Sequence, residues 1–245
     1  MIIHPLSQLK RLSLTILEFF LPRLCLFCGA AVGEKARMAV CPECEGKIQW
    51  AASPRCLCCG KVFASREGED RMCGSCQQEP PPFRQARAAA VYDGPPAEAI
   101  KRLKFNRQLA YLPVMQEWLK PLALVMAEQA DLIMPVPLHP RRLKSRGFNQ
   151  ALLLAQGLTA LPLARDTLIR VRHTRPQVEL SPKERRENVK GAFAVSRPER
   201  VKGKRVLLVD DLFTTGATAR ECARALQKAG AVQVDILTVA RTKQD

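Results

Sequence analysis

The feature that most constrains this fold is a series of four C-x-x-C pairs within residues 25–76. Each C-x-x-C turn directs two thiolates at one point, and two turns roughly a dozen residues apart complete a tetrahedral four-thiolate site for zinc. Grouping neighbouring pairs gives two such sites, so the sequence predicts a double zinc ribbon. The expected ligands are Cys25, Cys28, Cys41 and Cys44 for the first zinc, and Cys56, Cys59, Cys73 and Cys76 for the second.

Two other uses of paired cysteines compete with zinc. A disulfide framework needs an oxidising compartment, but Glu18 interrupts the apolar part of the N-terminus and no small-residue cleavage site precedes Cys25. Redox-active pairs are disfavoured because the four pairs lack a strand–helix context. Two complete sets of four thiolates leave no open coordination position, so the two zinc ions are expected to be structural. Cys58, an extra cysteine inside the third pair, either replaces a neighbouring ligand or stays free.

Two glycines and one isolated cysteine complete this interpretation. Gly29 and Gly60 follow the second cysteine of their pairs, where a positive φ closes the turn. Cys222 lies far from the other nine cysteines, among the alanines of a predicted helix. We expect it to be a small buried side chain.

Residues 1–24 form the first predicted segment, an amphipathic helix with apolar residues at helical spacing. We expect the helix to pack on its own protein, and the alternative is an interfacial helix on a membrane or a partner. No apolar run reaches the ~18 residues that a transmembrane helix needs, and the mean hydropathy is −0.11. The expected location is therefore the cytoplasm, with no transmembrane segment.

Charge and proline divide the remaining chain into two parts. The formal net charge is +16, which favours polyanionic partners. Residues 1–80 hold 10 basic and 8 acidic side chains, whereas residues 81–245 hold 29 and 15. Three consecutive prolines from Pro80 can continue neither a helix nor a central strand. The predicted domains are thus a zinc ribbon over 25–79 and a larger domain over 80–245.

The larger domain alternates apolar runs with helical patterns, which predicts an α/β fold with a mainly parallel sheet. The expected strands cover residues 88–92, 132–136, a segment ending near 195, 205–209 and 232–240. The expected helices cover residues 96–105, part of 110–127, 149–158 and 217–229.

The most informative segment of this domain follows the run Arg205–Val209, which reads as a strand buried on both faces. Asp210 and Asp211 come where that strand is expected to end, at the sheet edge that binds ligands in open α/β folds. The hydroxyl-rich loop Thr214–Thr218 then opens into a helix, whose N-terminus favours a phosphate. Two acids beside a phosphate-binding loop suit a ribose 5-phosphate. The alternative is that the acids and the Thr-Gly sequence only form an ordinary capped turn. Neither a Walker A loop nor a G-x-G-x-x-G loop is present.

The segment VLLVDDLFTTGAT at 206–218 resembles the phosphoribosyl pyrophosphate (PRPP) motif of type I phosphoribosyltransferases. Together with the cysteine pairs and the segments 101–108, 135–150 and 175–193, it resembles the ComF family of competence proteins. The resemblance covers nearly the whole chain. It implies a type I phosphoribosyltransferase fold with a mainly parallel sheet, preceded by a small zinc-ribbon module.

The resemblance also implies roles for single residues. Asp210 and Asp211 would be the catalytic pair that binds the ribose hydroxyls, and Mg²⁺ would bridge pyrophosphate and ribose oxygens. Thr214 stands where purine-salvage members carry an acid that contacts the base, so a purine substrate is disfavoured. The implied 5′-phosphate ligands are Thr214, Thr215, Gly216, Ala217 and Thr218, and the pyrophosphate loop supplies Arg141, Arg142, Lys144 and Arg146.

A basic segment over 165–205 contains 13 basic and 5 acidic residues. Within it, Ser181 and Glu184 form a capping-box pattern that predicts a short helix ending before Gly191. This helix carries Arg185 and Arg186. It could close over PRPP as a hood, contact the phosphates of single-stranded DNA, or be a solvated surface.

Two functions follow from the resemblance and the residues. The first is a ComF-like protein of natural transformation, which binds PRPP with Mg²⁺ and single-stranded DNA in the cytoplasm during DNA uptake, together with other DNA-uptake proteins. The alternative is a metabolic phosphoribosyltransferase that acts on an unidentified nitrogenous acceptor and carries the zinc module as a structural appendage.

Overall fold

A computed structural model describes residues 23–33, 38–65, 67–174 and 181–243, which divide into two compact units that meet between Lys47 and Ile48. Each unit is considered by itself. The helix predicted for residues 1–24 lies, except for its last two residues, outside the described part of the chain. Within the described residues, no helix has the length and apolar character needed to cross a bilayer.

The first unit contains the first four cysteines and little regular structure. A turn after Cys25 closes with the N–H of Gly29 donating to the Cys25 carbonyl at 2.9 Å. The short helix α2 (Pro42–Glu45) begins directly after Cys41. Among the described residues of this unit, Cys25, Cys41 and Cys44 are buried together with Val32 and Val40, so cysteines make up much of the described interior.

The second cysteine group belongs to the larger unit, where it is attached to the sheet. Its helix α3 (Gly74–Gln78) begins after Cys73. The strand β1 (Gln85–Val91) accepts this segment along its free edge: the Ala86 N–H donates to the Cys58 carbonyl at 2.6 Å, and the Ala51 N–H donates to the Ala89 carbonyl at 3.0 Å. The cysteine segment thereby covers an edge strand that would otherwise expose unpaired backbone groups.

The sheet itself is parallel, as predicted. Its order is β1, β6 (Gln233–Arg241), β5 (Arg205–Phe213) and β2 (Leu132–Pro135), and all three neighbouring pairs are parallel. The central strands β5 and β6 are almost entirely buried, which explains their continuous apolar sequences.

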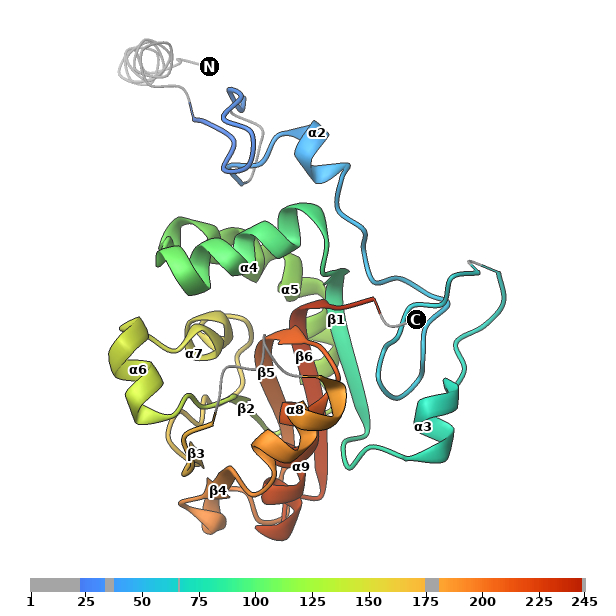
Figure 1. Cartoon of the computed structure of the whole chain (residues 1–245), viewed down its shortest axis with the longest axis vertical. Helices are drawn as coiled ribbons and strands as arrows, with labels where there is room; N and C mark the ends of the chain where they lie inside the picture. Colours follow the sequence, from blue (N-terminus) through green and yellow to red (C-terminus); the bar gives the residue numbers. More distant parts are fainter. Residues whose placement is uncertain (1–22, 34–37, 66, 175–180, 244–245) are drawn as a thin grey trace, which may run out of the picture. The chain divides into compact units, whose positions relative to one another are not determined.

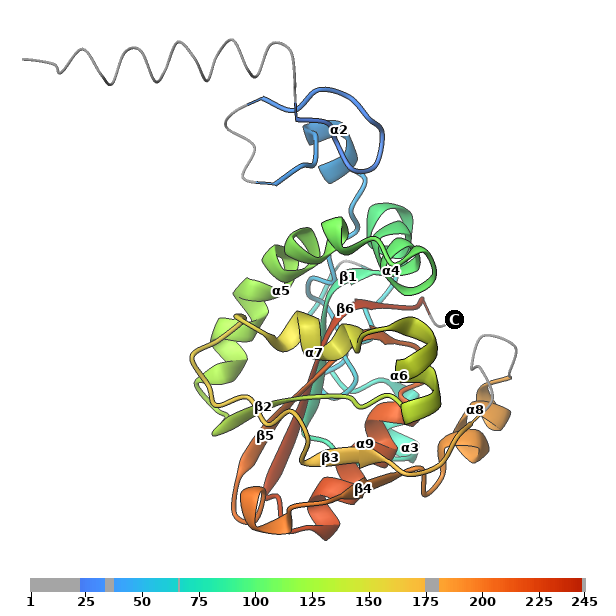
Figure 2. The same ribbon diagram turned by 90° about the vertical axis from the view of Figure 1, so that its left-hand side faces the viewer.

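Helices cover both faces of this sheet (Figures 1 and 2). The helix α5 (Leu112–Ala127) packs on β1 and β6, and α7 (Gln150–Ala155) packs on β2 and β5. The helix α4 (Gly94–Asn106) is joined to α5 by the short turn η1 (Leu109–Tyr111). Figure 1 shows α9 (Ala217–Lys228) on the other side of the sheet.

A smaller substructure accompanies the sheet near α9. The antiparallel pair of β3 (Leu168–Arg170) and β4 (Phe193–Val195) is followed by η3 (Pro198–Arg200). The helix α8 (Pro182–Val189) connects towards β4, and its predicted capping box is present, with the Glu184 N–H donating to Ser181 Oγ at 3.3 Å.

Three features differ from the sequence-based expectation. The helix α6 (Pro140–Arg146) was not expected, because the prolines around His139 read as a loop. The strand β3 was too short to give a pattern. The strand β5 continues to Phe213 instead of ending at Val209, because β6 pairs with it beyond the two acids, so Asp210 and Asp211 lie inside the strand.

The substitution Gly60→Ala is expected to lower the free energy of unfolding of the larger unit by about 2 to 4 kcal/mol. A Cβ at Gly60 (φ +68°) would lie 2.5 Å from the Ala86 carbonyl oxygen on β1, whereas the corresponding Gly29 has open space. The control is Gly203→Ala in the same unit, since Gly203 has φ +71° and no atom within 4 Å. Chemical denaturation of both variants measures the difference, and equal losses would contradict a close approach of ribbon and sheet.

Candidate functional site

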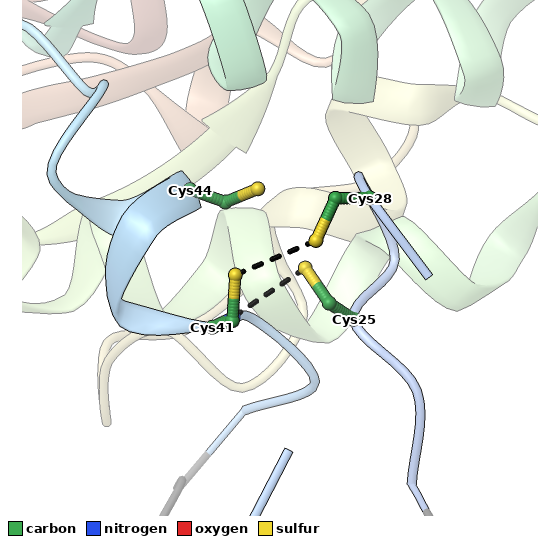
Figure 3. A group of neighbouring side chains, drawn as sticks. All are labelled: Cys25, Cys28, Cys41 and Cys44. Carbon is green, nitrogen blue, oxygen red and sulfur yellow. Dashed lines mark hydrogen bonds between the residues drawn. The ribbon is translucent and has the colours of Figure 1, made fainter. Parts of the chain in front are cut away.

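The eight predicted zinc ligands lie in two groups of four. In each group the sulfur atoms lie within 4.8 Å of one another. Figure 3 shows the first group, in which Cys25, Cys28, Cys41 and Cys44 come from a turn and the start of α2 and point towards one centre. The second group joins Cys56, Cys59, Cys73 and Cys76, while Cys58 stands outside it.

Backbone N–H groups favour the thiolate form of one cysteine in each group, whereas burial raises the pKa of three other cysteines among the eight. Burial would raise the pKa of Cys25, but hydrogen bonds from backbone N–H groups, that of Cys41 first, lower it to about 6. The same balance, with N–H groups of Cys73 and Cys59, lowers the pKa of Cys56 to about 7. Four sulfur donors within 4.8 Å of one another fit zinc, which takes tetrahedral thiolate ligands and leaves no position for catalysis once bound by four of them.

A separate cavity of about 620 Å³ opens where all four strands of the sheet end. Tyr92 follows β1, Val136 follows β2, the end of β5 contributes Asp210 and Asp211, and Thr242 follows β6. This is the sheet edge that the sequence predicts for a ligand. The predicted site residues that line it are Asp210, Asp211, Thr214, Gly216, Ala217, Thr218, Arg142, Arg146 and Arg185.

One lysine makes the pKa values of the two acids in this pocket shift in opposite directions. Asp211 is 3% exposed, and its Oδ2 lies 2.5 Å from the Nζ of Lys104 on α4. Burial alone would raise the pKa of Asp211, but Lys104 outweighs burial and the pKa is lowered. Burial and the neighbouring Asp211 charge raise the pKa of Asp210 well above its usual value. Lys104 therefore favours the carboxylate form of Asp211, whereas Asp210 is protonated more easily than an ordinary aspartate.

The loop after β5 has the features of an anion-binding loop. Gly216 takes φ +75° and is the N-cap of α9, so the loop turns directly into the positive end of a 12-residue helix. Within the described structure, the Thr215 hydroxyl is buried without a hydrogen-bond partner, and so is that of Thr238 on the pocket wall. A buried hydroxyl without a protein partner can bond to a bound ligand or to water.

Four arginines surround the same pocket. Arg142 and Arg146 project from α6, Arg185 from α8 and Arg170 from β3. Burial lowers the pKa of Arg146 and of Arg170, and Arg170 Nη2 donates to Thr174 Oγ1 at 2.5 Å. With Lys104 already paired, these four guanidinium groups favour a ligand with several negative charges.

Other predicted residues do not reach the pocket lining. Arg141 and Lys144 are exposed on α6, and Arg186 lies 3.7 Å from the Glu79 carboxylate. Thr215 belongs to the loop but contributes only its buried hydroxyl. Cys222 is fully buried in α9, as expected.

Sequence reasoning missed Lys104 and Arg170. Lys104 belongs to the segment KRLKFNRQ, which carried the family resemblance but gave no role to a single residue. Arg170 lies on a three-residue strand without a recognisable pattern, so nothing local could identify it.

Two family models match successive parts of the chain. A family model described as a double zinc ribbon domain matches residues 16–79, and one described as a phosphoribosyl transferase domain matches residues 143–245. Among solved structures, the glutamine PRPP amidotransferase of B. subtilis is 24% identical, with a TM-score of 0.39 over 58% of this chain and 30% of that chain.

Curated relatives match almost the full length. DNA utilization protein YhgH of Salmonella typhimurium is 34% identical over 228 residues, which cover 89% of this chain and 90% of the relative. Competence protein F of Haemophilus influenzae is 34% identical over 84% of this chain and 92% of its own, and competence protein ComFC of Bacillus subtilis is 25% identical over 89% and 95%. This chain, in which a double zinc ribbon precedes a type I phosphoribosyltransferase domain, therefore belongs to the ComF family of competence and DNA utilization proteins.

Proposed function

We propose that the pocket binds PRPP together with Mg²⁺, and that the protein acts in the cytoplasm in the uptake or use of single-stranded DNA. The observation that carries the first part is the juxtaposition, in one cavity, of an acid pair, a hydroxyl-rich helix N-terminus and four arginines. These groups match the three parts of PRPP, namely a diol, a 5′-phosphate and a pyrophosphate.

The chain's own residues would divide this ligand between them. The carboxylate of Asp211, fixed by Lys104, would accept hydrogen bonds from the ribose hydroxyls. The loop 214–218 would hold the 5′-phosphate, with the Thr215 hydroxyl as a donor that has no other described partner. Arg142, Arg146, Arg170 and Arg185 would stabilise the pyrophosphate charge, including the charge that develops if pyrophosphate leaves. Mg²⁺, when bound, would neutralise part of the same charge through hard oxygen ligands.

Asp211→Asn is expected to weaken PRPP binding by about 100-fold or more, because a buried charge-assisted hydrogen bond and the ion pair with Lys104 are both lost. Isothermal titration of PRPP and Mg²⁺ into the zinc-loaded protein measures this change. The matched control is Asp166→Asn, since Asp166 is an exposed acid paired with Arg197 and Arg200 outside the pocket. Absence of binding by the wild type would overturn the proposed ligand, and unchanged affinity of Asp211→Asn would overturn the assignment of the site.

The DNA part of the proposal rests on the surplus of positive charge and on the names of the relatives. The larger domain carries most of the net charge of +16, and cations outside the pocket remain available for other phosphates. Arg141 and Lys144 lie exposed on the same helix that sends Arg142 and Arg146 into the pocket. We propose that the two exposed side chains contact the backbone of single-stranded DNA.

The double variant Arg141→Gln/Lys144→Gln is expected to weaken oligonucleotide binding and to reduce the salt dependence of log affinity by about 1.4, since each neutralised phosphate contributes about 0.7 on a single strand. Fluorescence anisotropy with a labelled oligothymidine at several salt concentrations measures both quantities. The control is Arg197→Gln/Arg200→Gln, which also removes two positive charges from exposed side chains. The proposed DNA contact would be wrong if both double variants changed the slope of log affinity against log salt concentration equally.

A metabolic phosphoribosyltransferase is the second candidate, and one observation favours it. The Phe105 side chain is 68% exposed and lines the pocket near Tyr92, so an aromatic face is available to stack a nitrogenous base. Release of pyrophosphate from PRPP in the presence of such a base would support turnover. If the protein binds PRPP but releases no pyrophosphate with any base of a panel, the pocket would only bind PRPP.

A further inference from the structure

Arg241, the last residue of β6, lies between the second cysteine group and the phosphate-binding loop. Its side chain is only 2% exposed. Its Nη1 donates to the carbonyl oxygen of Cys59 and lies 3.9 Å from the Cys59 sulfur. Arg241 therefore contacts a predicted zinc ligand directly.

The opposite side of the same guanidinium faces an aromatic ring. The guanidinium carbon lies 5.5 Å from the centre of the Phe213 ring, and the two residues are partners in the β5–β6 register. Phe213 is 6% exposed and packs edge-to-face on Phe83 at 6.1 Å. A Cβ at Gly216 would lie 2.7 Å from the tip of the Phe213 ring. The position of this ring therefore limits where the phosphate loop can run.

The charge of Arg241 has no counter-charge among the side chains that the structure describes. In the described residues Arg241 makes no ion pair, and its Nη2 is buried without a hydrogen-bond partner. A buried cation without a counter-charge is costly. Four thiolates around Zn²⁺ leave a net negative site, and N–H groups commonly donate to such sulfur ligands. The second zinc site is thus the counter-charge that holds Arg241, and Arg241 holds Phe213.

We infer that Arg241 is a positioning residue that couples the second zinc site to the phosphate loop through Phe213. Zinc at Cys56, Cys59, Cys73 and Cys76 fixes Arg241, which fixes the ring beneath Gly216 and keeps the loop ready for a phosphate. The inference rests on the proposed function, because it concerns the loop that would bind the 5′-phosphate of PRPP. Coupling between two ligands is reciprocal, so PRPP must also stabilise zinc at the second site.

The zinc affinity of the purified two-zinc protein tests this reciprocity. Competition with a colorimetric chelator of known zinc affinity, measured at equilibrium, gives the zinc affinity with and without PRPP and Mg²⁺, while calorimetry gives the PRPP affinity of the same samples. In the wild type, one zinc ion is expected to bind at least about 5-fold more tightly when PRPP is bound. In Arg241→Met, this protection of zinc by PRPP is lost and PRPP binds about 10-fold more weakly.

Matched variants separate coupling from general stability. Arg87→Met is the control, because Arg87 also joins the ribbon to β1, through Leu57 O at 3.0 Å, but is bonded to neither a cysteine sulfur nor Phe213. It is expected to keep the PRPP-dependent protection of zinc. Arg241→Lys retains the charge and is expected to recover part of the coupling. Phe213→Leu leaves the Arg241 contact with Cys59 in place, so the zinc affinity without PRPP stays as in the wild type while the protection disappears.

The outcomes distinguish this inference from the proposed function. A wild type that gives no heat with PRPP refutes the proposed ligand and this coupling with it. A wild type that binds PRPP without any gain in zinc affinity refutes the coupling alone. The coupling also fails if Arg241→Met and Phe213→Leu both retain wild-type affinity and wild-type protection of zinc.

Discussion

Cys73→Ser is expected to release one of two zinc ions and to lower the free energy of unfolding of the unit from Ile48 onward by about 3 kcal/mol or more. Cys25→Ser is expected to release the other zinc ion and to leave the unfolding of that larger unit unchanged. The two variants remove chemically identical ligands, so the difference comes from what each ribbon is attached to.

The second ribbon is part of the structure that surrounds the sheet. The Cys58 carbonyl accepts from the Ala86 N–H at 2.6 Å, and Cys59 packs against the main hydrophobic core. Arg241 of β6 donates to the Cys59 carbonyl. Loss of zinc would leave several thiolates without their cation at the edge of β1, so the free energy of zinc binding is also free energy of folding for the sheet. The first ribbon lies in the unit that ends at Lys47.

Two measurements separate these effects. Metal analysis counts the zinc ions of each variant, and tryptophan fluorescence during denaturation reports on the larger unit alone, because both tryptophans of the chain, Trp50 and Trp118, lie there. Cys58→Ser is the matched control, since Cys58 lies outside both groups of four and its loss should leave two zinc ions. Retention of two zinc ions by Cys73→Ser, or equal destabilisation by Cys25→Ser, would refute this account.

Local patterns predicted the parts of this molecule that depend on near neighbours in the chain. The grouping of eight cysteines follows from short spacings, and the passage from β5 through Thr214–Thr218 into α9 is continuous in sequence. The parallel sheet follows from alternating strands and helices. Each of these predictions needs only residues that lie close together along the chain.

The contacts that give the site its electrostatics join distant segments, and no periodicity reveals them. Lys104 on α4 reaches Asp211 on β5, and Arg241 on β6 reaches Cys59 in the ribbon. Even the end of β5 depended on a distant partner, because pairing with β6 extends the strand through Asp210 and Asp211. Sequence alone therefore identified the acids but not the groups that set their charge.

Lys104→Met is expected to lower the free energy of unfolding by about 3 kcal/mol at neutral pH and to abolish measurable PRPP binding. The substitution leaves the buried carboxyl group of Asp211 without its cation, beside Asp210, whose pKa is already raised. In the wild type the pKa of Asp211 is lowered, so its carboxylate stabilises the fold at pH values above the pKa that Asp211 has in the unfolded chain. Without Lys104, burial raises the pKa of Asp211, so its carboxylate destabilises the fold. The difference in free energy of unfolding between Lys104→Met and the wild type should therefore become smaller as the pH falls. It should be smallest below the lowered pKa of Asp211, where this carboxyl group is protonated in both proteins.

The double variant Lys104→Met/Asp211→Asn distinguishes the charge from the contact. It removes both partners of the ion pair, so most of the lost stability is expected to return, whereas PRPP binding is not, because the acid that would accept from the ribose is gone. Lys120→Met is the control, since Lys120 pairs with Glu117 on an exposed face of α5 and such pairs contribute about 0 to 1 kcal/mol. Denaturation at two pH values and calorimetry with PRPP measure the wild type, both single variants of the pair, their double variant and Lys120→Met. Additive losses in the double variant would show that Lys104 and Asp211 act independently, and Lys104 would then have no part in setting the charge of the site.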